Sequence, residues 1–369
     1  MGKYTLSDTA LRKKQWVEEF FRDIAANNYF IPRLGAAFSS NVEKGVLEEE
    51  RFRYGSPNDV MWIKQDLKSQ GSTKHRKGDQ LTFGLIPRID PKTNRGMVGG
   101  DALAGQAISL VEYSHTSTLQ RYLQLVAAGE PLQWHKAAFD LPAHSKAALH
   151  TWGIETINLL CCEALATSPS QTFYTQSGTI KRTATYATSK SAITATDKLT
   201  PELIWFLNTW VKTGGDRTMI PLRPVMVDGK GYLVLLTYPD CLHDFKQNST
   251  VMQALREAEV RGSENPIFKG AKYIFDGIVI HEHEFVTHGT DGGSGAIPYA
   301  MGHLLGASSL VMAMGEDPTI EETYENKGEE MEYKFAMTMK VEKPVFNSQD
   351  YGSIGLCLAR TNVSNLAAT

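Results

Sequence analysis

The chain is poor in cysteine, and this rules out one common way of stabilising a fold. It has four cysteines in 369 residues. Cys161 and Cys162 are neighbours inside a helical pattern, where their side chains point apart, and Cys241 and Cys357 lie far from both in sequence. A disulfide framework therefore does not fit this sequence. We predict four small, buried, apolar side chains instead.

A strong charge and a long apolar run are also missing. The formal net charge is −3, which is too small to indicate a domain that binds nucleic acid or another polyanion. No apolar run reaches the roughly eighteen residues of a membrane span, and the first residues, MGKYTLSDTALRKKQW, lack the apolar stretch of a secretory signal. With 42% hydrophobic residues, the chain is expected to be globular, made in a cytoplasm and free of membrane contact.

Motifs for nucleophilic or nucleotide chemistry are absent. The segment GGSGA at 292–296 comes nearest to a nucleophile elbow, but neither a strand directly before Ser294 nor a helix directly after it is predicted. No glycine-rich segment ends in Gly-Lys-Ser or Gly-Lys-Thr, so a phosphate-binding loop is not indicated. Paired carboxylates occur only in polar surroundings, where a solvated face explains them. We predict neither an enzyme nor a bound cofactor.

One histidine pattern keeps an alternative open. The sequence HEHE at 281–284 places His281 and His283 two residues apart, so on a strand both side chains point the same way. With His288 as a third ligand they could hold a metal ion, as in a metal-dependent hydrolase. An exposed, charged strand end would produce the same pattern. No zincin motif or cysteine pair accompanies the histidines.

The most unusual stretch present is residues 67–105, which is rich in glycine and basic residues yet has an apolar centre. Residues 80–90 alternate around Leu81, Phe83 and Leu85, which predicts a strand with one buried side, in a β-hairpin. Ordering each backbone residue costs about 1–2 kcal/mol, and an isolated two-stranded ribbon is marginal in water. The apolar side of this hairpin is therefore expected to be buried by another molecule.

A basic cluster lies within the same stretch. Lys74, His75, Arg76 and Lys77 follow one another without interleaved aromatic residues, which single-strand binding would favour. Because the whole chain is close to neutral, contact of Lys74, Arg76 and Lys77 with acidic side chains of a neighbouring subunit is preferred over nucleic-acid binding.

Helix and strand signals alternate without a regular β-α-β order, so an α+β fold is predicted. A long helix is expected over 141–168, capped by Asp140, with an apolar stripe that includes Leu149, Trp152 and Leu159. Further helices are predicted over 6–26, 201–211 and 249–260. Strands are predicted over 107–126, in two runs within 224–238, over 331–347 and near 354–358.

Four segments resemble those of a known family: DVMWIKQDLKSQGSTKHRKGDQLTFGL (59–85), MVGGDALAGQ (97–106), NPIFKGAKYIFDGIVIHEHEFV (265–286) and HLLGASSLVMAMG (303–315). They are similar to major capsid proteins of tailed phages with the Hong-Kong-97-type fold, and more narrowly to those of coliphage N-four-like viruses. The resemblance implies the following divisions: an N-terminal arm (1–65), an extended loop (66–106), a peripheral domain (107–200) with spine helix 141–168, an axial domain (201–300), and a return to the peripheral sheet (301–369).

The resemblance also implies a function and partners. Copies of the chain would form the hexamers and pentamers of an icosahedral virion head, assembled in the host cytoplasm, with portal, scaffolding and decoration proteins as further partners. The head would enclose double-stranded DNA that the shell contacts non-specifically. Leu81, Phe83 and Leu85 would lie on the adjacent subunit, and the loop GTDGGSGA would lie near the capsomer axis. A cellular compartment of the same fold, filled with protein, stays open as an alternative. Covalent locking through Lys74, Lys77 or Lys92 is not expected.

Overall fold

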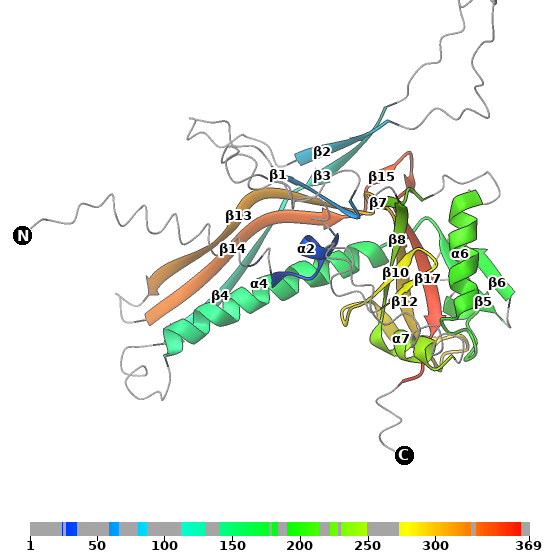
Figure 1. Cartoon of the computed structure of the whole chain (residues 1–369). Coiled ribbons are helices and arrows are strands. Elements are labelled where there is room, and N and C mark those ends of the chain that lie inside the picture. The colour runs from blue at the N-terminus through cyan, green and yellow to red at the C-terminus, as the bar shows by residue number, and fades with distance from the viewer. Residues whose placement is uncertain are drawn as a thin grey trace, which may run out of the picture.

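A computed structural model describes a large part of the chain, and the following account concerns that part. The described residues are 24, 27–34, 59–65, 80–86, 112–129, 140–176, 179–183, 190–213, 222–227, 230–248, 273–325 and 330–362. They form a four-stranded and a nine-stranded sheet, two two-stranded pairs, and several helices (Figure 1). The mixed architecture agrees with the predicted α+β class. None of the helices in this part combines the length and the apolar composition that crossing a bilayer requires.

The four-stranded sheet forms the elongated half of the molecule. Its strand order is β1-β13-β14-β4, and the bounds are Met61–Gln65 for β1, Leu310–Glu325 for β13, Glu330–Glu342 for β14 and Gln120–Gly129 for β4. β1 runs parallel to β13, whereas β14 is antiparallel to both β13 and β4. The predicted strand over 331–347 is thus confirmed as β14 for most of its length.

Helix α4, Leu141–Ala166, lies along this sheet (Figure 1). Asp140 caps it as predicted, accepting a hydrogen bond from the backbone N–H of Ala143 at 3.2 Å. The side that faces the sheet includes Leu149, Gly153 and Ile157, and Trp152 packs edge-on against Phe335 of β14. Leu159 was expected on this side but is 42% exposed, because the buried stripe runs through Ile157 and Cys161 instead.

The nine-stranded sheet forms the compact half. Its main path is β6-β5-β17-β12-β8-β10-β9, with β11 paired to β12 and β7 paired to β8. The bounds are Thr172–Gln176 (β5), Thr179–Thr183 (β6), Val225–Val227 (β7), Lys230–Thr237 (β8), Tyr273–Phe275 (β9), Ile278–Glu282 (β10), His288–Gly292 (β11), Ile297–Leu305 (β12) and Ser353–Ala359 (β17). Helices α6, Pro201–Thr213, and α7, Pro239–Lys246, pack on one face.

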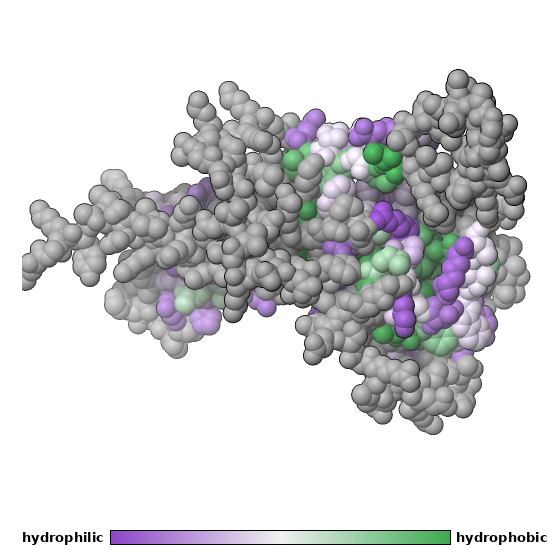
Figure 2. Space-filling model, turned by 45° about the horizontal axis from the view of Figure 1, so that its top comes forward, coloured by the Kyte–Doolittle hydropathy of each residue, from purple (hydrophilic) through white to green (hydrophobic). Residues whose placement is uncertain are grey.

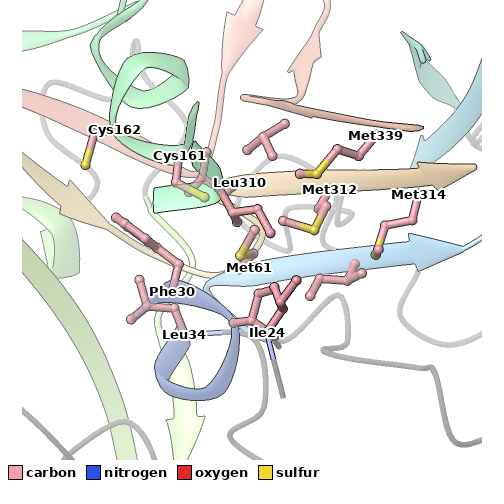
Figure 3. Packing of buried hydrophobic residues seen from close by; sticks show 14 of the residues in the cluster. Ile24, Phe30, Leu34, Met61, Cys161, Cys162, Leu310, Met312, Met314 and Met339 are labelled. Carbon is pink, nitrogen blue, oxygen red and sulfur yellow. The ribbon is translucent and has the colours of Figure 1, made fainter. Parts of the chain in front are cut away.

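A single core connects the two sheets. One cluster of buried side chains includes Leu149 of α4, Phe335 of β14, and Val234 and Val279 of the nine-stranded sheet. Figure 3 shows Phe30 and Leu34 in this cluster together with Met61 of β1 and Met312 of β13. All four cysteines are buried and none forms a disulfide, which confirms the prediction for them. Figure 2 shows one outer face, where apolar and polar described residues lie side by side.

The predicted strand over 107–126 is wrong in its extent. Leu119 interrupts it, which leaves β3, Tyr113–Thr118, and β4 in different sheets. β3 pairs antiparallel with β2, Gln80–Leu85, and these two strands form a separate ribbon. The Leu119 side chain packs with the ribbon cluster beside Gly315 of β13. Alternation along the sequence could not show this change of sheet.

Two of the described elements were not predicted. The short helix α2, Phe30–Leu34, begins after Asn28, whose Oδ1 accepts from the backbone N–H groups of Phe30 and Ile31. The return of residues 301–369 to the peripheral sheet stays a prediction; within this range β17 joins the nine-stranded sheet, where it pairs with β12 and β5. The strand β1 was not predicted at all. Most of the predicted helix 6–26, and all of 249–260, lie outside the described residues.

Candidate functional site

The ribbon formed by β2 and β3 contains three of the residues that the sequence singled out. Leu81 is 8% exposed and Phe83 is fully buried. Both pack in a cluster with Val311 and Ala313 of β13, and Phe83 contacts the ring of Trp62 with 5.1 Å between centroids. The apolar side of the ribbon is thus covered by its own chain. β1 and β13 of the same chain present a matching apolar face, so the burial of Leu81 and Phe83 does not require a second molecule.

Leu85 lies at the end of β2, partly buried beside the same cluster. Contact of Leu81, Phe83 and Leu85 with a neighbouring subunit stays a prediction. Lys74, Arg76 and Lys77 lie outside the described residues. The structure therefore brings the three apolar residues together on β2. The basic cluster is known from the sequence alone.

Polar contacts also fix the ribbon to the four-stranded sheet. His115 Nε2 of β3 lies 2.8 Å from Glu342 Oε1 of β14, and the backbone N–H of Val345 donates to His115 Nδ1 at 3.4 Å. Because Nδ1 accepts a hydrogen bond, the ring donates to Glu342 through Nε2. Burial alone would raise the pKa of Glu342, but the hydrogen bonds from His115 and Ser117 and the positive charges nearby together outweigh burial, and the pKa is lowered. The ribbon thus has an apolar and a polar attachment.

The three histidines of the alternative metal site do not form one. β10 ends at Glu282, so His283 is no longer on the strand and the period-two argument fails there. Each Nδ1 atom has a different partner: Tyr29 Oη at 2.9 Å for His281, the N–H of Phe285 at 3.2 Å for His283, and Val286 O at 2.9 Å for His288. Within the described residues no three metal-ligating side chains lie together. His281, His283 and His288 therefore do not form the metal site that the hydrolase hypothesis required.

His281 and His283 instead hold the segment around α2 in place. The Tyr29 ring lies between His281 and His283, with centroids 6.0 and 4.7 Å away, and Arg33 covers it at 4.2 Å. Burial raises the pKa of the Tyr29 hydroxyl well above its ordinary value. Burial also lowers the pKa of His283. Neutral groups are thus favoured here, which suits a structural junction.

A surface that the sequence did not indicate lies on β4. Leu123 is 52% exposed and Leu125 is 56% exposed, and both project from the face of the four-stranded sheet that α4 does not cover. β4 is also the edge strand of that sheet. The alternation of Leu123 and Leu125 is the sequence signal for this surface. It could be interpreted only if the break at Leu119, which makes β4 a separate strand, were known. Exposed apolar side chains on an edge strand are typical of an assembly contact.

Comparison with known proteins decides the family. A family model described as phage capsid protein matches residues 5–346. The chain belongs to the phage capsid protein family. No curated protein matches it in sequence. As a member of this family it is a structural protein of the virion, a subunit of the icosahedral head, and it assembles with further copies of itself.

Solved capsid structures share the fold of this capsid protein. The capsid of Ralstonia phage GP4 is 21% identical, with 91% of this chain and 92% of that chain covered and a TM-score of 0.71. The cyanophage Pam1 capsid is 18% identical over 83% and 90%, with a TM-score of 0.66. The capsid of Helicobacter pylori bacteriophage KHP30 is 12% identical over 82% and 88%, with a TM-score of 0.62. The Hong-Kong-97-type fold predicted from the sequence is confirmed.

Proposed function

We propose that this capsid protein forms the hexamers and pentamers of a head that encloses double-stranded DNA. The family match over residues 5–346 carries the proposal. The finer relationship, to coliphage N-four-like viruses, is supported by the segments 59–85, 97–106, 265–286 and 303–315. In this proposal the four-stranded sheet with α4 is the peripheral domain, the nine-stranded sheet is the axial domain, and the glycine-rich turn after β11 lies near the capsomer axis.

The contact between neighbouring subunits within a hexamer or pentamer is proposed to be electrostatic. Residues 68–95 contain seven Lys and Arg against two Asp, whereas residues 316–332 contain eight Asp and Glu against one Lys. Among the described residues, Glu321 and Glu322 follow in the half of β13 that is remote from Val311 and Ala313, against which the ribbon packs. A chain that has one basic and one acidic segment favours head-to-tail contacts between copies, which close into rings.

We therefore assign the acidic part of the β13–β14 hairpin as the surface that receives Lys74, Arg76 and Lys77 of the next copy. Glu321 and Glu322 are exposed there and already bind lysines of their own chain, Lys334 at 2.8 Å and Lys146 at 2.9 Å. In this arrangement Leu85, at the end of β2, lies closest to the neighbouring subunit. Leu81 and Phe83 fix β2 to β13 of their own chain.

Electron microscopy of the protein produced alone tests the proposal. Closed particles or hexameric rings are expected. Strictly monomeric protein across a range of salt and protein concentration would contradict it. The triple variant Lys74→Glu, Arg76→Glu, Lys77→Glu is expected to abolish rings. Arg223→Glu, Lys212→Glu and Lys230→Glu make the matched control, because these three exposed residues allow the same charge change at sites outside the basic segment. Equal assembly of the two triple variants would contradict the electrostatic contact.

A further inference from the structure

The outer edge of β4 is open in the described part of the chain. β14 pairs with one side of β4, and no described strand pairs with the other. Natural proteins protect such edges with lysine, proline, bulges or short strands. β4 has ten residues, contains no proline or lysine, and has Arg121 as its only charged residue. Its single register irregularity lies at the far end, next to Gly129.

We propose that β4 pairs antiparallel with β4 of a second copy, across a two-fold axis that passes beside Gln124. The inference rests on the proposed function, because it identifies a contact that would join one ring of subunits to another. Head-to-tail contacts close a ring, but a closed icosahedral shell also contains two-fold axes, where the same patch of both subunits meets. The two sheets would join into one eight-stranded sheet.

The sequence of β4 is self-complementary in this register. Leu123 faces Leu125 of the second copy, and Tyr122 faces Val126, so apolar pairs form on both faces of the strand. Arg121 faces Ala127, which avoids two like charges opposite each other. Cross-strand apolar pairs stabilise a sheet, and the two-fold axis doubles each of them. Shifting the strands by two residues would place Leu125 opposite Arg121 in one direction, and Leu123 opposite the smaller Ala127 in the other.

Gln124 has a contact that suits the unassembled subunit. Its side-chain Nε2 donates to the backbone carbonyl oxygen of Leu125 at 3.2 Å. An edge strand has backbone acceptors that water or a side chain must satisfy until a second strand arrives. The Gln124 amide does this for Leu125, at the centre of the proposed contact. On pairing, a backbone N–H of the second copy replaces it, and the two Gln124 side chains face each other.

Cysteine cross-linking tests the register. Residues directly opposite in antiparallel strands have Cα atoms about 4.5–5.5 Å apart, which a disulfide can bridge. Diagonal neighbours are about 7–8 Å apart, which is too far. Particles assembled from a mixture of Leu123→Cys and Leu125→Cys chains are thus expected to form covalent dimers on oxidation. Particles of either variant alone are expected to stay several-fold less cross-linked. The four native cysteines are buried and do not interfere.

Leu159→Cys is the matched control, since Leu159 is an exposed leucine on α4. Mixed with Leu123→Cys it is expected to give only background cross-linking. Equal cross-linking in mixed and single-variant particles, or none in either, would overturn the β4 pairing.

A second measurement needs no substitution. In hydrogen exchange of the unaltered chain, the outward-facing backbone amides among residues 121–127 are expected to slow at least tenfold on assembly. Particles in which these amides exchange as fast as in the free subunit overturn the pairing and leave the proposed function intact. Failure of the unaltered chain to form particles would contradict the proposed function itself.

Discussion

Lys343 and Asp350 form a buried ion pair where the chain passes from the four-stranded to the nine-stranded sheet. Nζ lies 3.0 Å from Oδ2, and the two side chains are 5% and 2% exposed. The segment between them contains the small strand pair of β15, Val345–Phe346, and β16, Gln349–Asp350. Asp350 also exchanges two hydrogen bonds with Ser170, which follows α4. One carboxylate therefore connects the end of the long helix to the junction of both sheets.

Removing one partner of this pair should destabilise the protein strongly. Asp350→Asn leaves the lysine charge buried without a counter-charge, and breaking a buried pair in this way costs about 3–5 kcal/mol. The double variant Lys343→Met, Asp350→Asn should recover part of this loss. Denaturant unfolding of the unassembled subunit measures both. A single variant as stable as the parent would contradict the role assigned to the pair.

His303 should make the stability of the subunit depend on pH. Burial between the strands β8 and β17, with the charge of Lys343 nearby, lowers its pKa from 6.5 to about 3. The folded state thus excludes a proton that the unfolded state binds below about pH 6.5. This stability is complete above that pH and is lost as the pH falls toward 3, by about 1.4 kcal/mol per pH unit.

Unfolding measurements at pH 7 and pH 5 on the parent and on His303→Leu check this. The parent is expected to lose more stability than the variant by about 2 kcal/mol, because the isosteric leucine has no proton to exchange. The same pH dependence in both proteins would show that other groups, such as the half-buried His283, account for it.

The contact between Tyr29 and His281 should stabilise the attachment of α2. Tyr29→Phe removes the hydroxyl that lies 2.9 Å from His281 Nδ1 and leaves a polar atom of a fully buried histidine without this partner. Such a loss costs about 1–3 kcal/mol. Tyr324→Phe is the control, because Tyr324 is 60% exposed and its change should stay within about 0.5 kcal/mol. Thermal unfolding of the two variants compares them directly.

Gly352 should not tolerate a larger side chain. A Cβ atom there would lie 2.4 Å from Ser309 Cα and 2.6 Å from Ser308 O, both of which are backbone atoms. Gly352→Ala therefore forces the β12–β13 connection away from β17 and should reduce the yield of soluble subunit several-fold. Gly295→Ala is the comparison. It has a positive φ of 96° but open space around it, so it should cost only about 1 kcal/mol. Similar yields would contradict the steric explanation.

Elements with strong local signals were predictable. Asp140 with Pro142 fixed the start of α4, and the Thr200-Pro201 pair fixed the start of α6, because caps act within one turn of the helix. The alternation in 331–347 and the apolar run at 354–358 located β14 and β17. β1 was missed because only five residues form it, and its burial comes from pairing with β13, which no local pattern reveals.

For the ribbon, the sequence identified the buried residues but not the surface of the same chain that covers them. Leu81 and Phe83 are indeed the buried side of a strand, but alternation says only that a side is apolar and cannot say which surface covers it. Val311 and Ala313, more than two hundred residues later, do so. The exposed leucines of β4 went unnoticed, since an apolar side chain on a strand is expected to be buried unless the sheet edge is known.

Composition, caps, alternation and segment similarity thus determined the α+β class, the long helix, the lack of a disulfide framework and the family. The three-dimensional arrangement alone decided that the ribbon rests on its own chain, that His281, His283 and His288 form no shared metal site, and that β4 has an open apolar edge among the described strands. The physical reason is the distance along the sequence over which each effect acts. Capping and periodicity depend on residues a few positions apart, whereas burial, pairing and pKa depend on which distant segments the folded chain brings into contact.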